Sequence, residues 1–394
     1  MAGIPRYKAF HGPALFRQGF RPFFLGAGIW AALAILVWLT IIRGDMSLAG
    51  GFPPTRWHAH EMLFGFATAA ATGFLLTAVP NWTGRMPLQG AALIVLFGVW
   101  GLGRAAMCIS SAIGEPLAAL IDISFLALLF TIVLREVVAG RNWRNLPVVV
   151  AVASLLAANG LMHLEASRVL ANGLLGERLG VATFVLLISL IGGRIIPSFT
   201  RNWLVKRDSD VLPVPFNRFD VGVLLLVLIA LASWVLIPQA IFTGFALIAA
   251  GAASLVRLVR WRGWLTLSEP LLWVLHLGYA WLAAGLILLG GAVLVPDAIP
   301  YSAGLHALTA GAIGTMILAV MTRATRGHTG HPLTAGLNTT AIYALITLAA
   351  LLRVAAPFMP DLYLGLLSAS GWLWISAFTM FAVAYGPMLL TASR

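Results

Sequence analysis

The sequence contains few charged residues and a single cysteine. Only 10% of its 394 residues are Asp, Glu, Lys or Arg, whereas a soluble domain has about 25%. Together with 60% hydrophobic residues, this low charge excludes a soluble globular protein. The lone Cys108 excludes an internal disulfide, a thiolate metal cluster and a C-x-x-C-H haem attachment motif.

Apolar runs that are each long enough to cross a bilayer recur along the whole chain. No polar stretch is long enough to form a separate soluble domain. We therefore predict an all-α, polytopic integral membrane protein with a single membrane domain over residues 1–394. The twelve predicted spans are 22–42, 57–79, 88–109, 116–138, 146–166, 178–198, 220–237, 240–257, 270–294, 300–322, 336–356 and 362–390.

The formal net charge of +12 is explained by basic residues in short loops, so it indicates topology and a lipid bilayer rather than nucleic acid. With the N-terminus inside, the inner segments hold 18 Lys and Arg residues and the outer segments hold 6. This asymmetry predicts that both termini are cytoplasmic. The cytoplasmic loop near 199–219 then separates six helices from six, and no repeat between the halves is apparent beyond that equal number.

Polar side chains recur near the outer ends of several predicted spans, where burial in hydrocarbon is costly and usually functional. The stretch "WHAHEM" supplies three of them at the start of the second span. His276 lies deeper, in the ninth span. The outer group consists of His58, His60, Glu61, Arg104, Asp122, Asn159, His163, Glu165 and His306.

Several histidines at one depth favour a metal or haem site, because imidazole is a common ligand of both. Glu61 and Asp122 would orient the imidazoles, and with Glu165 they are candidates for a proton path. The alternative is an interhelical hydrogen-bond network or a water-filled vestibule. His58 and His60 point to nearly opposite sides of an ideal helix, which favours two separate roles over chelation of one ion.

A second group of polar residues lies at the cytoplasmic end of the tenth span, in "MTRATRGHTGHPL". Glycine and proline break the helix there, and the loop from Arg323 to His331 is cationic. It is interpreted as a positive-inside loop, a site for an anionic group or a structural clamp.

Seven stretches, in order from residue 19 to 333, resemble the NnrS family. The family consists of bacterial inner-membrane proteins with twelve spans, which contain haem and copper and are associated with nitric oxide stress. "WHAHEM" and "RGHTGHP" at this separation are the most specific. The stretches are "GFRPFFLGAGIWA", "WHAHEMLFGF", "PNWTGRMPL", "NGLMHLE", "GGRIIPSFTRN", "EPLLWVLHLGYAWL" and "HALTAGAIGTMILAVMTRATRGHTGHPL".

The resemblance implies haem, of b type, and copper, but does not divide the histidines between them. It implies these cofactor ligands: His58, His60, His163, His276, His306 and His328. All but His328 are also candidate metal ligands. Unlike haem-copper oxidases, the sequence has no adjacent His-His pair and no tyrosine four residues from such a histidine.

Two functions are compatible with these features. In the first, the protein binds or detoxifies nitric oxide in a bacterial inner membrane, in a denitrification-type context, and takes any electrons from quinol or a partner protein. Whether it turns nitric oxide over as an oxidoreductase stays open. The alternative is a transporter or metal-handling carrier that uses the outer His/Glu/Asp group without redox turnover.

Overall fold

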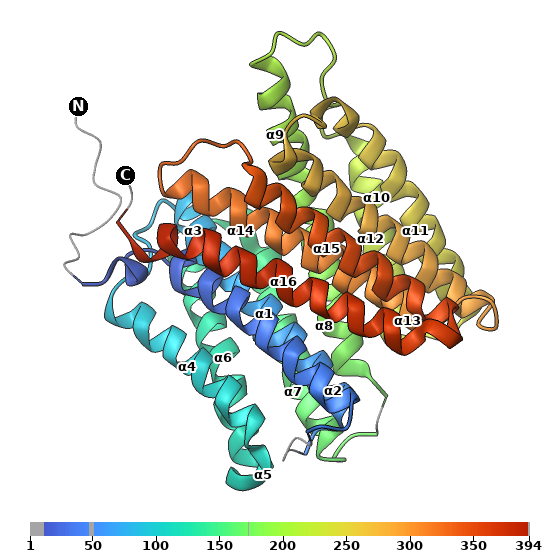
Figure 1. Cartoon of the computed structure of the whole chain (residues 1–394). Coiled ribbons are helices and arrows are strands. Elements are labelled where there is room, and N and C mark those ends of the chain that lie inside the picture. The colour runs from blue at the N-terminus through green and yellow to red at the C-terminus, as the bar shows by residue number, and fades with distance from the viewer. Residues whose placement is uncertain (1–11, 47–50, 172, 393–394) are drawn as a thin grey trace. The chain divides into compact units, whose positions relative to one another are not determined.

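The structure, a computed structural model, describes residues 12–46, 51–171 and 173–392. It is helical, with no strand among the residues described, and Figure 1 shows long rods joined by short connections. Within these described ranges, twelve helices are long and apolar enough to cross a membrane. The prediction of an all-α, multi-pass membrane protein is confirmed, while the cytoplasmic location of the termini stays a prediction.

The first six spans begin and end close to the predicted bounds, but the second and sixth are longer because their polar ends continue the helix. Both also contain a π-helical segment, which divides them into two α-helices. The spans are α1 (Phe20–Ile42), α2–η2–α3 (Pro54–His60, Glu61–Ala67 and Thr68–Thr83), α4 (Ala91–Cys108), α6 (Glu115–Ala139), α7 (Leu146–Ala166) and α8–η4–α9 (Leu175–Leu187, Ile188–Gly192 and Gly193–Val205). The short α5 (Ser110–Ile113) links α4 to α6.

The last six spans include a third π-helical segment, in the tenth. The predicted division between the seventh span, 220–237, and the eighth, 240–257, is confirmed, because one helix ends at Leu236 and the next begins at Ile241, on either side of Pro238. The spans are α10 (Arg218–Leu236), α11 (Ile241–Val259), α12 (Pro270–Leu294), α13–η6–α14 (Tyr301–His306, Ala307–Gly314 and Thr315–His328), α15 (Leu337–Ala355) and α16 (Tyr363–Leu390).

The chain forms two compact units. The first unit comprises the described residues up to Gly180, with Ala324–His331 and the residues from Phe381 onwards. The second comprises Val181–Arg323 and Pro332–Met380. The division into six plus six helices at the 199–219 loop stays a prediction.

Aromatic packing holds the helices of the first unit together. Phe23 on α1 contacts the rings of Phe97 and Trp100 on α4 and of Phe125 on α6. The Trp100 indole also donates a hydrogen bond to the Gly65 carbonyl in η2, at 2.9 Å. A π segment widens the helix and disturbs its own hydrogen bonds, so such outside donors stabilise it.

In the second unit, a buried arginine donates the outside hydrogen bond to a π segment. Arg257 on α11 is fully buried and donates to the carbonyl of Ser189 in η4, at 2.9 Å. Its Nε also donates to Asp220, at 2.9 Å, and Asp220 in turn caps the first turn of α10. This pair neutralises the charge of the arginine and joins three spans.

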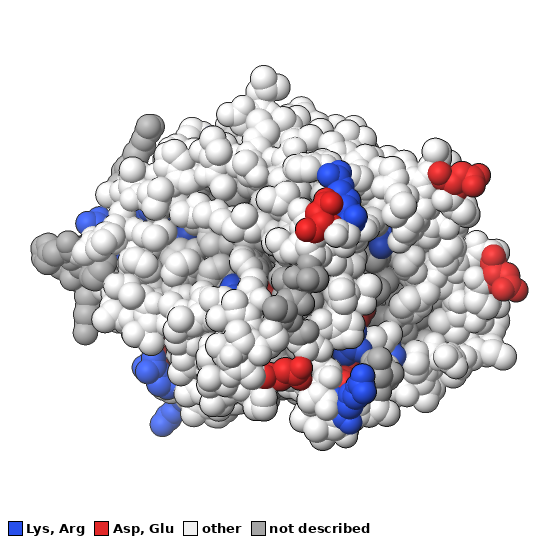
Figure 2. Space-filling view, turned by 60° about the horizontal axis from the view of Figure 1, so that its bottom comes forward, with Lys and Arg blue, Asp and Glu red and all other residues white. Residues whose placement is uncertain are grey.

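Few charges are visible on the face shown in Figure 2, where acidic and basic groups are scattered among uncharged residues. Several charged groups of the first unit are instead buried, including Glu61, Arg104 and Asp122. Buried charges are costly unless they are paired, so these side chains need oppositely charged partners.

Candidate metal centre

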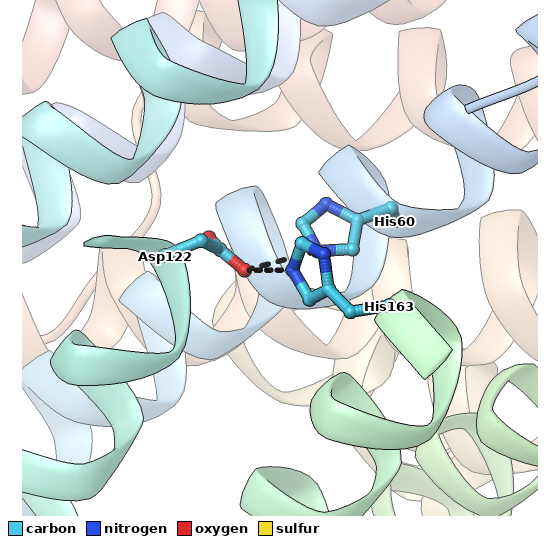
Figure 3. A group of neighbouring side chains, drawn as sticks. All are labelled: His60, Asp122 and His163. Atoms are coloured by element: carbon cyan, nitrogen blue, oxygen red, sulfur yellow. Dashed lines mark hydrogen bonds and ion pairs between the residues drawn. The ribbon is translucent and has the colours of Figure 1, made fainter. Parts of the chain in front are cut away.

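Four spans of the first unit bring polar side chains into one buried cluster. His60 ends α2 and Glu61 begins η2, directly after it. Arg104 comes from α4 and Asp122 from α6, while α7 supplies two more. Figure 3 shows the two imidazoles converging on the Asp122 carboxylate. The members are His60, Glu61, Arg104, Asp122, Asn159 and His163, all buried.

The Asp122 carboxylate is the centre of this cluster. Its Oδ2 atom lies 3.1 Å from His60 Nε2 and 3.1 Å from His163 Nε2. The same oxygen accepts a hydrogen bond from the Asn159 amide, at 2.8 Å. One ligand atom from each of His60, Asp122 and His163 lies within 4.8 Å of the other two.

These separations fit the donor atoms of a transition-metal site. Metal–nitrogen and metal–oxygen bonds of about 2.0–2.2 Å place tetrahedral ligands roughly 3.3 Å apart, and the carboxylate oxygen lies 3.1 Å from each imidazole nitrogen. Two imidazoles and one carboxylate suit zinc, copper or iron. In the described part of the chain, this is the one group of three His, Cys, Asp or Glu residues with such spacing.

The contacts of His60 strengthen that interpretation. Its Nε2 atom faces Asp122, while its Nδ1 atom lies 3.0 Å from Glu61 Oε1. Both ring nitrogens therefore face carboxylates, and Nε2 also lies 2.9 Å from Asn159 Oδ1, so either an imidazolium or a metal on Nε2 suits these acceptors. A metal at Nε2 with Nδ1–H donating to Glu61 is the carboxylate–histidine–metal arrangement of many metal sites.

The charges of the cluster also leave room for a cation. Glu61 and Asp122 carry two negative charges, and Arg104 makes ion pairs with both. Trp30 adds a neutral hydrogen bond to Glu61, at 2.8 Å. One further positive charge, a proton on His60 or a monovalent ion such as Cu⁺, makes the buried group neutral, and a divalent ion leaves it with one positive charge.

Phenylalanine covers the two imidazoles. The ring of Phe52 lies 5.2 Å from that of His60 and 5.3 Å from that of His163, centre to centre. Phe64 contacts His60 from its own helix, at 5.3 Å. This apolar cover excludes water from the ring faces and strengthens the electrostatic contacts beneath it.

His58 and His60 point in different directions, as their spacing predicts. His58 stacks on Trp38 of α1, with ring centres 4.7 Å apart and planes 13° apart. The prediction of separate roles for these two histidines agrees with this arrangement. A cofactor role for His58 stays a prediction.

Glu165 lies in a second ion pair. It accepts a 2.5 Å hydrogen bond from Arg56 and another, at 2.7 Å, from the backbone N–H of Leu175. Glu61 and Asp122 are thus members of the cluster, whereas Glu165 fixes the start of α2 and α8 against the end of α7. Proton transfer by any of the three stays a prediction.

The three remaining candidate histidines have other neighbours. The Nε2 atom of His276 lies 2.9 Å from the Thr200 hydroxyl, and its ring packs against Gly263. His306 donates from Nδ1 to the Ser302 carbonyl, at 2.8 Å. His328, an exposed residue, has its ring 5.4 Å from that of Phe20. Their cofactor roles stay predictions.

Two features of the cluster could not be predicted from the sequence, namely the Trp30–Glu61 hydrogen bond and the π segment. Trp30 is one of several tryptophans in apolar spans, and nothing in its local sequence indicates a bond to Glu61. The π segment after His60 has no composition that distinguishes it from the α-helix around it. Arg104 and Asn159 were visible as polar residues in spans, but their partners depend on how α4 and α7 pack.

The comparison with protein families agrees with these features. The family model described as "NnrS protein" matches residues 14–393, nearly the whole chain.

The chain belongs to the NnrS family.

The match confirms the resemblance found in the sequence motifs. No curated protein is similar enough to the chain to be named as a relative. Membership of NnrS and the His60–Asp122–His163 cluster together support a metal-associated membrane protein.

Proposed function

We propose that this NnrS protein is a bacterial inner-membrane metalloprotein that binds copper at His60, Asp122 and His163 and counters nitric oxide. The observation that carries the proposal is the spacing of the three donor atoms, which lie within 4.8 Å of one another in a buried cluster. The family resemblance supplies copper, haem and nitric oxide as the chemistry to test.

Copper suits this donor set better than most competing ions. Among divalent first-row metals, nitrogen-rich sites bind copper most tightly. Two imidazoles with one carboxylate give a three-ligand centre that keeps a position for an outside ligand. When bound, the copper ion would supply a redox-active centre that can take nitric oxide as a ligand.

The protein residues around this centre have distinct roles. Glu61 orients the His60 ring through Nδ1, at 3.0 Å. Arg104 makes ion pairs with both Glu61 and Asp122 and so holds the two carboxylates in place. Phe52 covers the imidazoles and excludes water. Nitric oxide is small and neutral, so it reaches such a buried site through the bilayer without a polar channel.

Among the histidines outside the cluster, His306 has the contact most typical of a haem ligand. Its Nδ1 lies 2.8 Å from the Ser302 carbonyl, which can only accept a hydrogen bond. In the neutral ring, Nδ1 therefore carries the proton and Nε2 presents the lone pair. A backbone carbonyl on one nitrogen is a common way to orient an imidazole that ligates through the other.

Nitric oxide loss in membranes tests the function. Membranes that contain the wild-type protein, supplied with an electron donor, should remove nitric oxide from solution faster than membranes that contain His60→Ala or His163→Ala. The matched control is His331→Ala, which removes a histidine that lies outside both the cluster and the six predicted cofactor ligands. Equal rates for the wild type and all three variants would contradict a role of this centre in nitric oxide chemistry.

A further inference from the structure

The ends of α9, α10 and α11 form one basic surface of the second unit. Backbone contacts hold its parts together. The Val214 N–H donates to the Arg260 carbonyl, at 3.0 Å, which ties the loop before α10 to the end of α11. The end of α9 packs against η5 (Gly263–Thr266), the short turn that follows α11. The exposed or half-buried basic residues of this basic surface are Arg201, Lys206, Arg207, Arg218, Arg260 and Arg262.

Acidic groups do not balance this charge. In residues 201–219 and 260–268 the acids are Asp208 and Asp210, both exposed. The six basic residues thus exceed these two acids by four charges. Asp220, at the start of α10, is buried and pairs mainly with the buried Arg257, at 2.9 Å, while Arg260 lies 3.5 Å from its other oxygen. The excess positive charge favours an anionic partner.

Three arginines of the basic surface lie over aromatic rings. A guanidinium that stacks on a ring uses its face, so the N–H groups along its edge remain available for the oxygens of an anion. The stack also holds the side chain in place before the anion arrives. The pairs, measured from guanidinium carbon to ring centre, are Arg207 over Trp203 at 3.8 Å, Arg260 over Phe219 at 4.9 Å and Arg262 over Trp264 at 5.4 Å.

The basic surface lies at the depth of lipid headgroups. α10 begins at Arg218 and α11 ends at Val259, so their ends mark one edge of the hydrocarbon region. The span that ends in α9 has 31 residues, about 46 Å at 1.5 Å per residue, whereas the hydrocarbon core is about 30 Å thick. In Figure 1 the end of α9 extends past the ends of α10 and α11. Trp264 is 48% exposed here, as is typical of an interfacial tryptophan.

Apolar side chains continue from the basic surface along the spans. Val221 and Leu225 are exposed on α10, and Val256 and Val259 are exposed on α11. The two helices pack against each other, so the charged groups stand at the end of a lipid-facing apolar surface. A molecule that fits both parts has an anionic head and hydrocarbon tails, whereas a soluble acidic protein would meet only the charges.

We propose that the basic surface binds anionic phospholipid. Arg207, Arg260 and Arg262 donate to the phosphate groups, and the acyl chains lie along α10 and α11. The claim is a preference for anionic over zwitterionic lipid, beyond the contact with lipid that every membrane protein has. The surface belongs to the second unit and the proposed copper centre to the first, so either proposal can fail without the other.

Lipid-dependent stability of the full-length protein in detergent tests the proposal. Phosphatidylglycerol and phosphatidylcholine with the same acyl chains are added in parallel titrations, and the Tm is measured. The Tm of the wild type should rise at lower concentrations of phosphatidylglycerol than of phosphatidylcholine. Each arginine contributes roughly five-fold to binding of an anionic lipid, so the triple variant Arg207→Gln/Arg260→Gln/Arg262→Gln should need about 100-fold more phosphatidylglycerol.

The matched control removes three exposed arginines from the first unit. Arg135, Arg141 and Arg144 lie at or near the connection between α6 and α7, on the same side of the membrane because span direction alternates. Their triple glutamine variant has the same net charge as the first variant but should keep the wild-type preference. If the first variant does not fold, Arg207→Gln/Arg262→Gln replaces it, because this double variant keeps the Arg260–Asp220 contact.

Two results would overturn the proposal. One is a wild-type protein whose Tm responds equally to both lipids, which is also the result expected if the partner is an acidic protein. The other is an equal loss of the preference in the site variant and in the control, because general attraction of a basic protein to anionic lipid would then explain the effect. Copper content, measured in the same samples, reports separately on the His60 centre.

Discussion

The two histidine sites have the same backbone pattern but different charges. At His60, the Glu61 carboxylate is the common partner: the Trp30 indole, the Arg104 guanidinium and the imidazole each contact it. At His306, the next residue is the uncharged Ala307, and the imidazole Nδ1 donates to the Ser302 backbone carbonyl. The comparison teaches that one backbone pattern, a histidine followed by a π segment, can hold an imidazole among buried charges in one place and beside an uncharged backbone carbonyl in another.

Removing Arg104 and Arg353, one arginine near the end of the third span and one near the end of the eleventh, should separate the two units most clearly. Arg104→Gln leaves Glu61 and Asp122 buried without their cation, so we expect the free energy of unfolding to fall by about 3–5 kcal/mol. Arg353→Gln removes a hydrogen bond with Tyr363 but no ion pair with a carboxylate, so it should cost only about 1 kcal/mol. Chemical unfolding in detergent, followed by tryptophan fluorescence, measures both. Equal losses would contradict the difference in charge.

Glu61 should matter for metal binding more than for folding. Glu61→Gln keeps the shape of the side chain but loses the negative charge that orients His60, so we expect copper affinity to fall about 10- to 100-fold. Competition with a chelator of known affinity measures the change. Wild-type affinity in this variant would show that Glu61 does not support the ligand.

The two glycines should respond alike, because both lie against a tryptophan. Gly65→Ala and Gly311→Ala each force a methyl group into the adjacent indole, and overpacking of this kind costs about 1–3 kcal/mol. Similar losses in the free energy of unfolding would confirm that the two π segments are equivalent. A loss at Gly65 alone would show that the shared pattern is limited to the sequence.

His58→Phe should have the smallest effect. The aromatic ring keeps the stack on Trp38, so we expect the free energy of unfolding to change by less than about 1 kcal/mol. Copper content should stay at the wild-type value. Loss of copper in this variant would mean that His58, and not only His60, ligates the ion.

Hydrophobicity alone was sufficient to predict the twelve spans, because a run of about 20 apolar residues has few other stable states. The alternating direction of the spans also predicted that His60, Asp122 and His163 lie at one level, and the structure brings the three together. The side chains that contact these three residues could not be predicted from the sequence. Which face of a helix meets which neighbour depends on packing between segments that are far apart in sequence.

The shared pattern of a histidine followed by a π segment was missed for a related reason. Apolar spans resemble one another everywhere, and the informative positions are few and widely spaced. The π segments after His60 and His306 mark the equivalent positions, and only the structure reveals where they begin. With that register, the shared glycines, Gly65 and Gly311, can be read directly from the sequence.

The most direct test of the account is the identity of the copper ligands. Purified wild-type protein should bind copper, and pulsed electron paramagnetic resonance of the oxidised ion should detect nitrogen from two imidazoles. One imidazole signal should disappear in His163→Ala, and copper should be lost in the double variant of His60 and His163, while His58→Ala keeps both signals. An unchanged copper signal in the double variant would contradict the assignment of the centre to His60, Asp122 and His163.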